Sequence, residues 1–73
     1  MNKAKTITIQ ANGEKFRGIP AECSLLEFLA ARQLSPGRVV VERNGEALTP
    51  AETRETILED GDRLEIVRIV AGG

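Results

Sequence analysis

Residues 5–20 read KTITIQANGEKFRGIP, a pattern typical of a β-hairpin. Polar and β-branched residues alternate over residues 5–10, which places the isoleucines on one face of a half-buried strand. The Asn-Gly pair at residues 12–13 indicates a tight turn, because both residue types tolerate a positive φ. A second strand is predicted over about residues 15–19, and the proline that follows it ends the pairing.

A helix is predicted directly after the hairpin, where residues 24–29 read SLLEFL. Ser24 and Glu27 have the spacing of a capping box, in which each side chain accepts a hydrogen bond from the other residue's backbone. An apolar stripe at helical spacing follows, made of Leu25, Phe28 and Leu29. We expect the helix to end at Gln33, because a Ser-Pro-Gly sequence comes shortly after it.

The second half of the chain predicts further strands and one short helix. Three consecutive valines within residues 38–43 indicate a strand that is buried on both faces. An Asn-Gly turn at residues 44–45 leads to a short segment over residues 46–48. Thr49 is suited to cap a short helix, since a proline follows it at the first helical position. The last strand is predicted over residues 63–70.

This order of elements predicts an α+β fold, with a mixed sheet of four to five strands and one main helix packed on one face. A helix that crosses between two strands favours parallel pairing of the strands that it joins. An N-terminal strand beside the C-terminal one would place the tail at an end of the sheet. Residues 1–73 are predicted to form a single domain with a flexible C-terminal tail at residues 71–73.

Composition argues against several classes of protein. The chain has 73 residues with 10 basic and 11 acidic side chains, and this near balance argues against a nucleic-acid binder. One cysteine and no histidine leave no internal disulfide, no zinc cluster and few groups for a self-contained enzyme. No apolar run is long enough to cross a membrane and no secretory signal is evident, so we expect a cytoplasmic protein.

The tail is the least ordinary feature of the sequence. Gly72 and Gly73 end the chain, and Ala71 alone separates them from an apolar strand. No side chain beyond Cβ stands near the terminal carboxylate, so an extended tail fits a narrow channel. Termini are commonly loose, and the alternative is an end with no role. We favour the first interpretation, in which the chain's own carboxylate is a substrate.

The last strand is apolar on both of its faces. Leu64 and Ile66 share one face, while Val67 and Ile69 share the other and Val70 follows. A strand covered on one side only is not expected to show this pattern. We therefore predict that Val67, Ile69 and Val70 dock to a partner. The alternatives are a central strand covered on both sides, or a β-bulge that switches the alternation.

The remaining candidates carry weaker signals. Leu26 lies beside the helical stripe and either extends the docking surface or caps the edge of the core. The acidic residues of segment 59–62 lack the spacing of a calcium-binding loop, so we expect a solvated turn. Arg38 and Arg43 are expected to be solvated or paired. Cys23 precedes a helix N-terminus, which activates thiols mildly, but with no base nearby in sequence we expect a structural or incidental thiol.

Residues 58–73 read LEDGDRLEIVRIVAGG and resemble the C-terminal region of the bacterial thiamin biosynthesis sulfur carrier proteins, the ThiS family. The Asp-Gly-Asp turn, the apolar strand and the terminal Ala-Gly-Gly all match. The Asn-Gly-Glu turn at residues 44–46 and the helix start at residues 24–29 fit as well, so the resemblance covers nearly the whole chain. A Gly-Gly end alone is shared with ubiquitin and with the small subunit of molybdopterin synthase.

The resemblance implies a ubiquitin-like β-grasp fold and a specific chemistry at Gly73. An E1-like activating enzyme would adenylate the Gly73 carboxylate with ATP, and a sulfur donor protein would supply sulfur to form a thiocarboxylate. Ala71 and Gly72 would thread the partner's active site. A thiazole synthase would take the sulfur to build the thiazole of thiamin. The chain would be a monomeric protein cosubstrate, with no bound cofactor and no metal, rather than an enzyme.

Two other functions stay open from the sequence. The same tail chemistry belongs to the molybdopterin synthase small subunit and to carriers of other sulfur pathways, although the short chain favours thiamin. The alternative from a different class is a non-covalent β-grasp interaction module with incidental glycines. Extending the chain beyond Gly73 separates these classes, because a non-covalent module keeps its partner.

Overall fold

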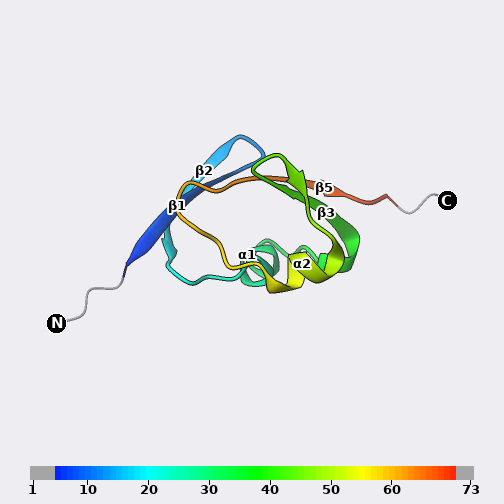
Figure 1. The fold of residues 1–73 in the computed structure, drawn as a ribbon, viewed down its shortest axis with the longest axis horizontal. Helices are drawn as coiled ribbons and strands as arrows, with labels where there is room; N and C mark the ends of the chain where they lie inside the picture. Colours follow the sequence, from blue (N-terminus) through cyan, green and yellow to red (C-terminus); the bar gives the residue numbers. More distant parts are fainter. Residues whose placement is uncertain (1–4, 71–73) are drawn as a thin grey trace.

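A five-stranded mixed sheet carries the main helix on one face in the computed structural model, which describes residues 5–70 (Figure 1). The strands stand in the order β2-β1-β5-β3-β4. In chain order the elements are β1 (Thr6–Ala11), β2 (Glu14–Pro20), α1 (Leu25–Ala31), the short 3-10 helix η1 (Pro36–Arg38), β3 (Val39–Arg43), β4 (Glu46–Ala47), α2 (Pro50–Glu55) and β5 (Arg63–Arg68). The predicted α+β architecture is confirmed.

The predicted hairpin is formed by β1 and β2. Asn12 and Gly13 have φ values of 51° and 84°, the left-handed conformation that this type of two-residue turn needs at both positions. Between the pairs made by Ile7 and Ile9, β2 contains one extra residue. Gly18 lies there with a φ of 71°, which glycine adopts without strain, so the hairpin accommodates a bulge.

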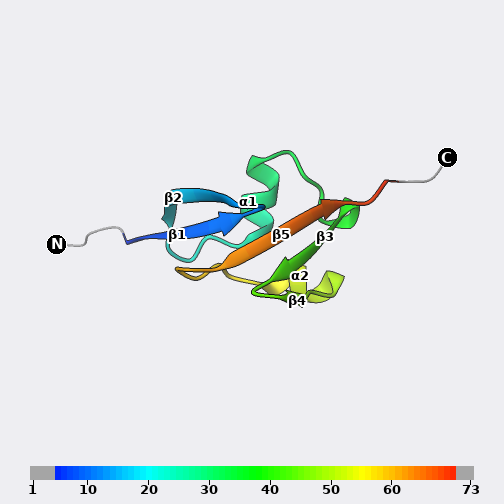
Figure 2. The ribbon, with the colours of Figure 1, turned by 90° about the horizontal axis from the view of Figure 1, so that it is seen from above.

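Strand β5 lies in the middle of the sheet, between β1 and β3 (Figure 2). It pairs in parallel with β1 through Ala11 and Leu64, and antiparallel with β3 through Val41 and Ile66. The N-terminal and C-terminal strands are therefore neighbours. Helix α1 connects β2 to β3, which run in the same direction but do not pair, because β1 and β5 lie between them. The predicted parallel pairing of the two strands that the helix joins was wrong.

Helix α1 starts as the sequence predicts. The Ser24 hydroxyl accepts a hydrogen bond from the Glu27 N–H at 3.0 Å, and the Glu27 carboxylate accepts one from the Ser24 N–H at 2.9 Å. Such a reciprocal cap satisfies two backbone donors that the helix leaves unpaired. The predicted apolar stripe is buried: Leu25, Phe28 and Leu29.

The helix ends at Ala31 rather than at the predicted Gln33. Gln33 has a φ of 62°, and its N–H donates to the Ala30 carbonyl at 2.9 Å. The N–H of Leu34 donates to the Leu29 carbonyl, also at 2.9 Å. These two bonds form a Schellman motif. The motif ends α1 at Ala31, although the next residues, Arg32 and Gln33, are of helix-forming types.

The core lies between α1 and one face of the sheet. Its buried hydrophobic residues are Ile9, Ala11, Leu25, Phe28, Leu29, Val39, Val41, Leu58 and Leu64. Strand β3 contributes one face only, because Val39 and Val41 are buried while Val40 is 45% exposed. The prediction that the valine run is buried on both faces was wrong. Within residues 5–70 both helices lie on one side of the sheet, so no layer covers the second face (Figure 1).

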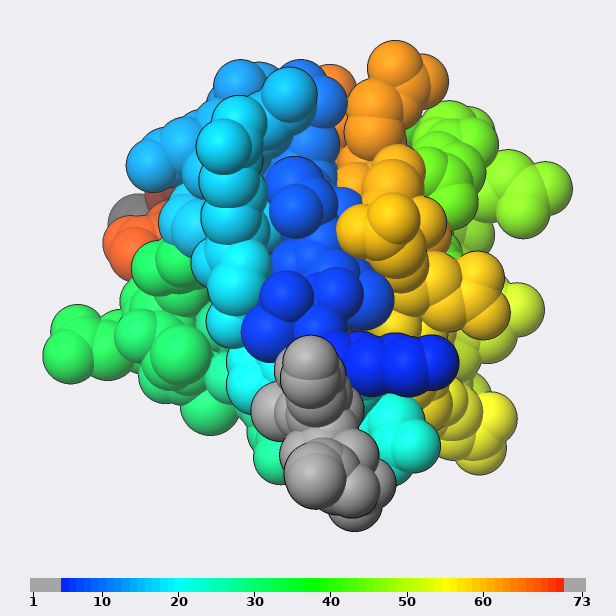
Figure 3. All heavy atoms as spheres, turned by 90° about the vertical axis from the view of Figure 1, so that its left-hand side faces the viewer, coloured from blue at the N-terminus to red at the C-terminus, as the bar shows by residue number. Residues whose placement is uncertain are grey.

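The segment between α2 and β5 packs beside the start of β1, as the yellow-to-orange and blue atoms in Figure 3 show. The N–H of Thr8 donates to the Asp60 carboxylate at 2.8 Å, and the N–H of Gly61 donates to the Thr8 carbonyl at 2.8 Å. These bonds join the turn before β5 to the opposite end of the chain. The segment that leads into β5 is therefore held along the middle of β1, and β5 itself begins opposite Gln10.

Helix α2 is the predicted short helix. Thr49 caps it and forms a second capping box with Glu52. After α2, Ile57 makes a single antiparallel bridge with Ser24. Among the residues that the structure describes, no helix is long and apolar enough to span a membrane.

Candidate functional site

The candidate site is the C-terminal half of β5, which leads into the tail. Leu64 is buried on the core face, whereas Val67 is 61% exposed. Val40 lies opposite Val67 on β3 and is itself exposed. Beyond the strand, Ile69 and Val70 are 53% and 84% exposed. We call Val40, Val67, Ile69 and Val70 the apolar patch.

The structure resolves the two alternatives that the sequence left open for this strand. The register of β5 with β3 runs without a shift from Arg68 opposite Val39 to Leu64 opposite Arg43, so no bulge switches its alternation there. Within residues 5–70, no element covers the side of the sheet that carries Val67. The exposure expected for β5 is present, and its role in docking stays a prediction.

Asn12 holds the second half of β5 in place. Its side-chain oxygen accepts a hydrogen bond from the Ile66 N–H at 2.7 Å, and its side-chain amide donates to the Ile66 carbonyl at 3.1 Å. Strand β1 ends at Ala11, so this side chain supplies the two bonds that one more strand residue would have made. One turn residue thereby extends the ladder that fixes β5.

Strand β5 ends at Arg68 rather than at the predicted Val70. One further backbone bond, from the Ile69 N–H to the Arg38 carbonyl at 2.9 Å, continues the pairing. Figure 1 shows this end of β5 reaching the edge of the molecule, beyond both helices. Residues 71–73, on which the predictions of covalent modification and threading fall, lie outside the described residues.

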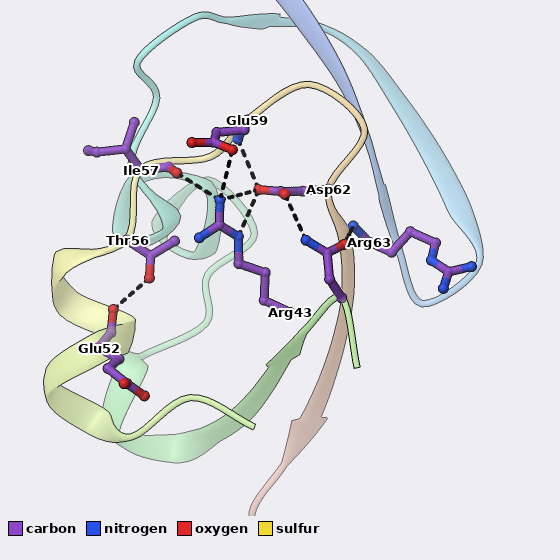
Figure 4. A network of polar contacts seen from close by, with 8 residues as sticks. Arg43, Glu52, Thr56, Ile57, Glu59, Asp62 and Arg63 are labelled. Carbon is purple, nitrogen blue, oxygen red and sulfur yellow. Dashed lines mark hydrogen bonds and ion pairs between the residues drawn. The ribbon is translucent and has the colours of Figure 1, made fainter. Parts of the chain in front are cut away.

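A buried ion pair precedes β5 (Figure 4). Asp62 is buried, Arg43 donates a hydrogen bond to its Oδ2 atom through Nε at 3.0 Å, and the Nη2 atom of Arg43 forms an ion pair with the same oxygen at 2.9 Å. The Asn44 side chain and the Glu59 N–H donate to it at 3.1 and 2.9 Å. The expectation of a wholly solvated turn was therefore wrong for Asp62, which is a structural carboxylate. No group of three potential metal ligands occurs within residues 5–70.

The thiol of Cys23 is not activated. It is half-buried, and its Sγ lies 3.5 Å from the Ser24 carbonyl, to which it donates. Burial, and after it the neighbouring Glu27 carboxylate, raises the pKa of the Cys23 thiol above its ordinary value. This direction is opposite to the mild activation that the sequence suggested for a thiol before a helix N-terminus. The structure favours the expected structural or incidental thiol.

Leu26 does not extend the apolar patch. It is half-buried on α1, which packs against the face of the sheet opposite Val67 (Figure 1). Val40, which the sequence analysis did not single out, does belong to the patch. A two-residue period counted from Val39 would have placed Val40 on the outer face, but three consecutive valines show no alternation that reveals it.

The chain is similar to known proteins in sequence and in fold. Residues 5–73 match the model of the ThiS family. The crystal structure of thiamine biosynthesis protein ThiS from Geobacter metallireducens has a TM-score of 0.73 and 30% identity, over 92% of this chain and 100% of that one. The uncharacterized protein ycf40 of Porphyra purpurea is 35% identical over 69 residues, 94% of this chain and 96% of that protein. Its namesake in Pyropia yezoensis is 39% identical over 67 residues, 92% of this chain and 93% of that protein.

Proposed function

The chain belongs to the ThiS family and is a ubiquitin-like sulfur carrier, and on this basis we propose that its Gly73 carboxylate carries sulfur as a thiocarboxylate. Its fold is the ubiquitin-like β-grasp that the sequence predicted. The observation that carries the proposal is the match to the family model through residue 73, which includes the Ala-Gly-Gly end. The apolar patch at the base of this tail supports it.

The proposed chemistry begins with activation, because a carboxylate is a poor electrophile. An E1-like adenylating enzyme joins the Gly73 carboxylate to the AMP portion of ATP, and pyrophosphate leaves. A sulfide equivalent from a sulfur donor protein then attacks the acyl carbon and displaces AMP. The product is a nucleophilic sulfur on a protein handle, which reaches the next enzyme by docking rather than by free diffusion.

We assign partner docking to the apolar patch. Val40 and Val67 form a cross-strand pair on the open face of the sheet, and Ile69 continues the exposed apolar surface toward the tail. Contiguous exposed apolar residues on a small protein mark interaction surfaces, and their burial contributes about 25 cal/mol per Å². Ala71 and Gly72 carry no side chain beyond Cβ, so the tail that follows fits a narrow channel.

We further propose that the sulfur is destined for the thiazole of thiamin, with a thiazole synthase as the acceptor. The solved structure that this chain resembles is a thiamine biosynthesis protein, which supports that destination. The names of the ycf40 relatives state no function and favour no pathway. In this scheme the chain is a cosubstrate whose tail is modified and regenerated, and ATP is bound by the adenylating enzyme.

Intact-mass spectrometry tests the carrier function. With an adenylating enzyme, ATP and a sulfur donor, the chain should gain the mass of one sulfur minus one oxygen, and tandem mass spectrometry should place the change at Gly73. A variant extended by one alanine beyond Gly73 should stay unmodified, since its glycine carboxylate is then part of a peptide bond. ATP without the enzyme should leave the chain unchanged.

Other outcomes of the same experiment are equally informative. Modification at Cys23, or no modification with the adenylating enzyme, would contradict the proposal. An extended variant that keeps its partner while the parent chain stays unmodified would indicate a non-covalent interaction module. If the thiocarboxylate forms, production of thiazole with a thiazole synthase, or of molybdopterin with the large subunit of molybdopterin synthase, identifies the pathway.

A further inference from the structure

Three arginines surround the base of the tail. Arg32 caps the end of α1, Arg38 ends η1 and Arg68 ends β5, and all three are exposed. Arg38 and Arg68 line one surface groove together with Ile69. Arg32 and Arg68 line a second groove beside it, which includes Phe16. We call Arg32, Arg38 and Arg68 the basic collar.

The guanidinium groups of the collar have no acceptor in the part of the chain that the structure describes. None of the three side chains makes an ion pair or a hydrogen bond within residues 5–70. Arg43, in contrast, is bonded to Asp62 and to the Ile57 carbonyl. Each guanidinium presents five N–H donors in one plane, so the collar offers many donors to an outside acceptor.

Arg32 is also held in position. Its Cζ lies 4.0 Å from the ring centroid of Phe16 and 4.7 Å from that of Phe28. The two rings pack edge to face, with centroids 5.3 Å apart. Stacking occupies the faces of a guanidinium and leaves its N–H edge available. A side chain fixed in this way loses less conformational entropy when it binds, which favours recognition over random solvation.

The charges around the collar are one-sided. Counting residues 5–70 only, the groove beside Arg38 has no carboxylate in its lining, and the groove beside Arg32 has one, Glu14. The carboxylates of Glu42 and Glu65 line a different groove. The chain as a whole has a net charge of −1, so this local excess of positive charge comes from the folded arrangement rather than from composition.

We propose that the basic collar docks on an acidic rim around the channel through which the adenylating enzyme admits the tail. This inference rests on the proposed function and adds the chemistry of the partner surface. Gly73 lies five positions after Arg68, and at about 3.3 Å per residue an extended tail spans about 17 Å. The collar therefore meets the mouth of the channel and stays away from the nucleotide, where only the tail reaches.

Charge reversal tests the collar. We expect the double variant Arg38→Glu with Arg68→Glu to raise the KM of the adenylating enzyme for the carrier at least about tenfold, with little change in kcat, because like charges then face each other across the rim. The matched control is Arg17→Glu, an exposed arginine on β2 that lines neither collar groove. It should change KM less than about twofold.

Salt supplies a second measurement that needs no variant. Raising ionic strength from about 0.05 M to about 0.5 M shortens the Debye length to a few ångströms, so the KM of the unchanged carrier should rise several-fold. The neutral double variant Arg38→Gln with Arg68→Gln should have a KM between those of the parent chain and the charge-reversed variant. Its KM should also depend less on salt than that of the parent. The salt dependence and the neutral variant test the collar even if the charge-reversed variant does not fold.

The outcomes separate the collar from the carrier function. A reversed pair that folds and keeps the KM of the Arg17→Glu control, or a KM of the parent that does not respond to salt, would overturn the collar while adenylation of the parent continues. A parent chain that the enzyme does not adenylate at all would overturn the proposed function, and the collar proposal with it.

Discussion

Asp62 is a charged side chain inside a small protein, and its partners explain why it is tolerated. An unpaired buried carboxylate is costly, whereas one that accepts several hydrogen bonds is stable. Asp62 accepts from the Arg43 guanidinium, the Asn44 amide and the Glu59 N–H. Asn44 also accepts from the Arg63 N–H at 2.9 Å. This group of residues joins the turn after β3 to the turn before β5 and sets where β5 begins (Figure 4).

Cys23 shows the opposite case, a reactive residue type in an unreactive setting. Its raised pKa keeps the thiol protonated through neutral pH, and only the thiolate is an effective nucleophile. The neighbouring Glu27 carboxylate favours the protonated thiol over the thiolate, because a negative charge beside the sulfur raises its pKa. This setting agrees with the proposal that the sulfur is carried on the terminal carbonyl rather than on Cys23.

We expect Cys23→Ala to retain thiocarboxylate formation and to lower the free energy of unfolding by at most about 1–2 kcal/mol, the effect of a small truncation at a half-buried site. Alkylation of the parent chain at pH 8 should be slower than that of a small free thiol, and should accelerate as the pH rises, because the thiolate fraction grows. Urea unfolding and a mass-resolved alkylation time course measure the two effects. Loss of sulfur transfer with the fold intact would give Cys23 a role.

Strand β5 combines two tasks along six residues. Its first half supplies Leu64 to the core, and its second half presents Val67 on the open face. The second half does not pair with β1, because β1 ends at Ala11. The side chain of Asn12 takes over through its two bonds to Ile66. The position of the tail base thus depends on one side chain in a hairpin turn.

We expect Asn12→Gly to loosen the end of β5 without changing the hairpin turn. Glycine adopts the φ of 51° found at Asn12, so the variant removes only the side-chain bonds and adds some chain entropy to the unfolded state. The loss should be about 1–3 kcal/mol for two hydrogen bonds and the added entropy. Hydrogen exchange should show a faster Ile66 amide, measured beside the amides of β3.

Asn12→Asp is the matched comparison, because aspartate tolerates the same backbone conformation and keeps the oxygen that accepts from Ile66. It should protect the Ile66 amide more than Asn12→Gly does. Equal protection of this amide in the parent and in Asn12→Gly would mean that pairing with β3 alone holds the strand.

The folded protein exposes several apolar side chains that do not pack into its core. A chain of about this size buries only about 60% of the surface that it exposes when unfolded, so its core is marginal. Val40 and Val67 nevertheless lie opposite each other on the open face, outside the core. The apolar patch, the basic collar and the base of the tail all lie at one end of β5. This concentration is what a protein that delivers its own terminus needs.

We expect Val67→Asp to weaken partner binding far more than folding. Val67 is exposed, so the free energy of unfolding should change by no more than about 0.5–1 kcal/mol. In a complex the new carboxylate would be desolvated without a partner charge, which should raise the KM of the adenylating enzyme at least about tenfold. Thermal unfolding and adenylation kinetics on the same preparation separate the two effects.

Leu64→Asp is the control from the core face of the same strand, where the side chain is buried, and it should unfold the domain. If Val67→Asp also unfolds the chain, the outer face takes part in the fold and its assignment to docking was mistaken. A stable Val67→Asp variant with unchanged kinetics would remove the apolar patch from the docking surface.

Local features of this chain could be predicted from the amino-acid sequence because their causes lie within a few residues. The Asn12-Gly13 turn depends on two residues that accept positive φ, and the cap of α1 depends on Ser24 and Glu27, three positions apart. The stripe of α1 follows from helical spacing alone. Family resemblance in the last sixteen residues added the proposed chemistry of Gly73, which no local pattern contains.

Other features were decided by tertiary structure, because they depend on residues that folding brings together. Asp62 is buried by Arg43, 19 positions away, and Asn12 bonds to Ile66, 54 positions away. The exposure of Val40 depends on which face of the sheet α1 covers, and three consecutive valines contain no alternation that indicates it. The basic collar likewise combines the ends of α1, η1 and β5. Sequence spacing specifies bonds within a turn or a cap, whereas a surface made from several elements exists only once the sheet has formed.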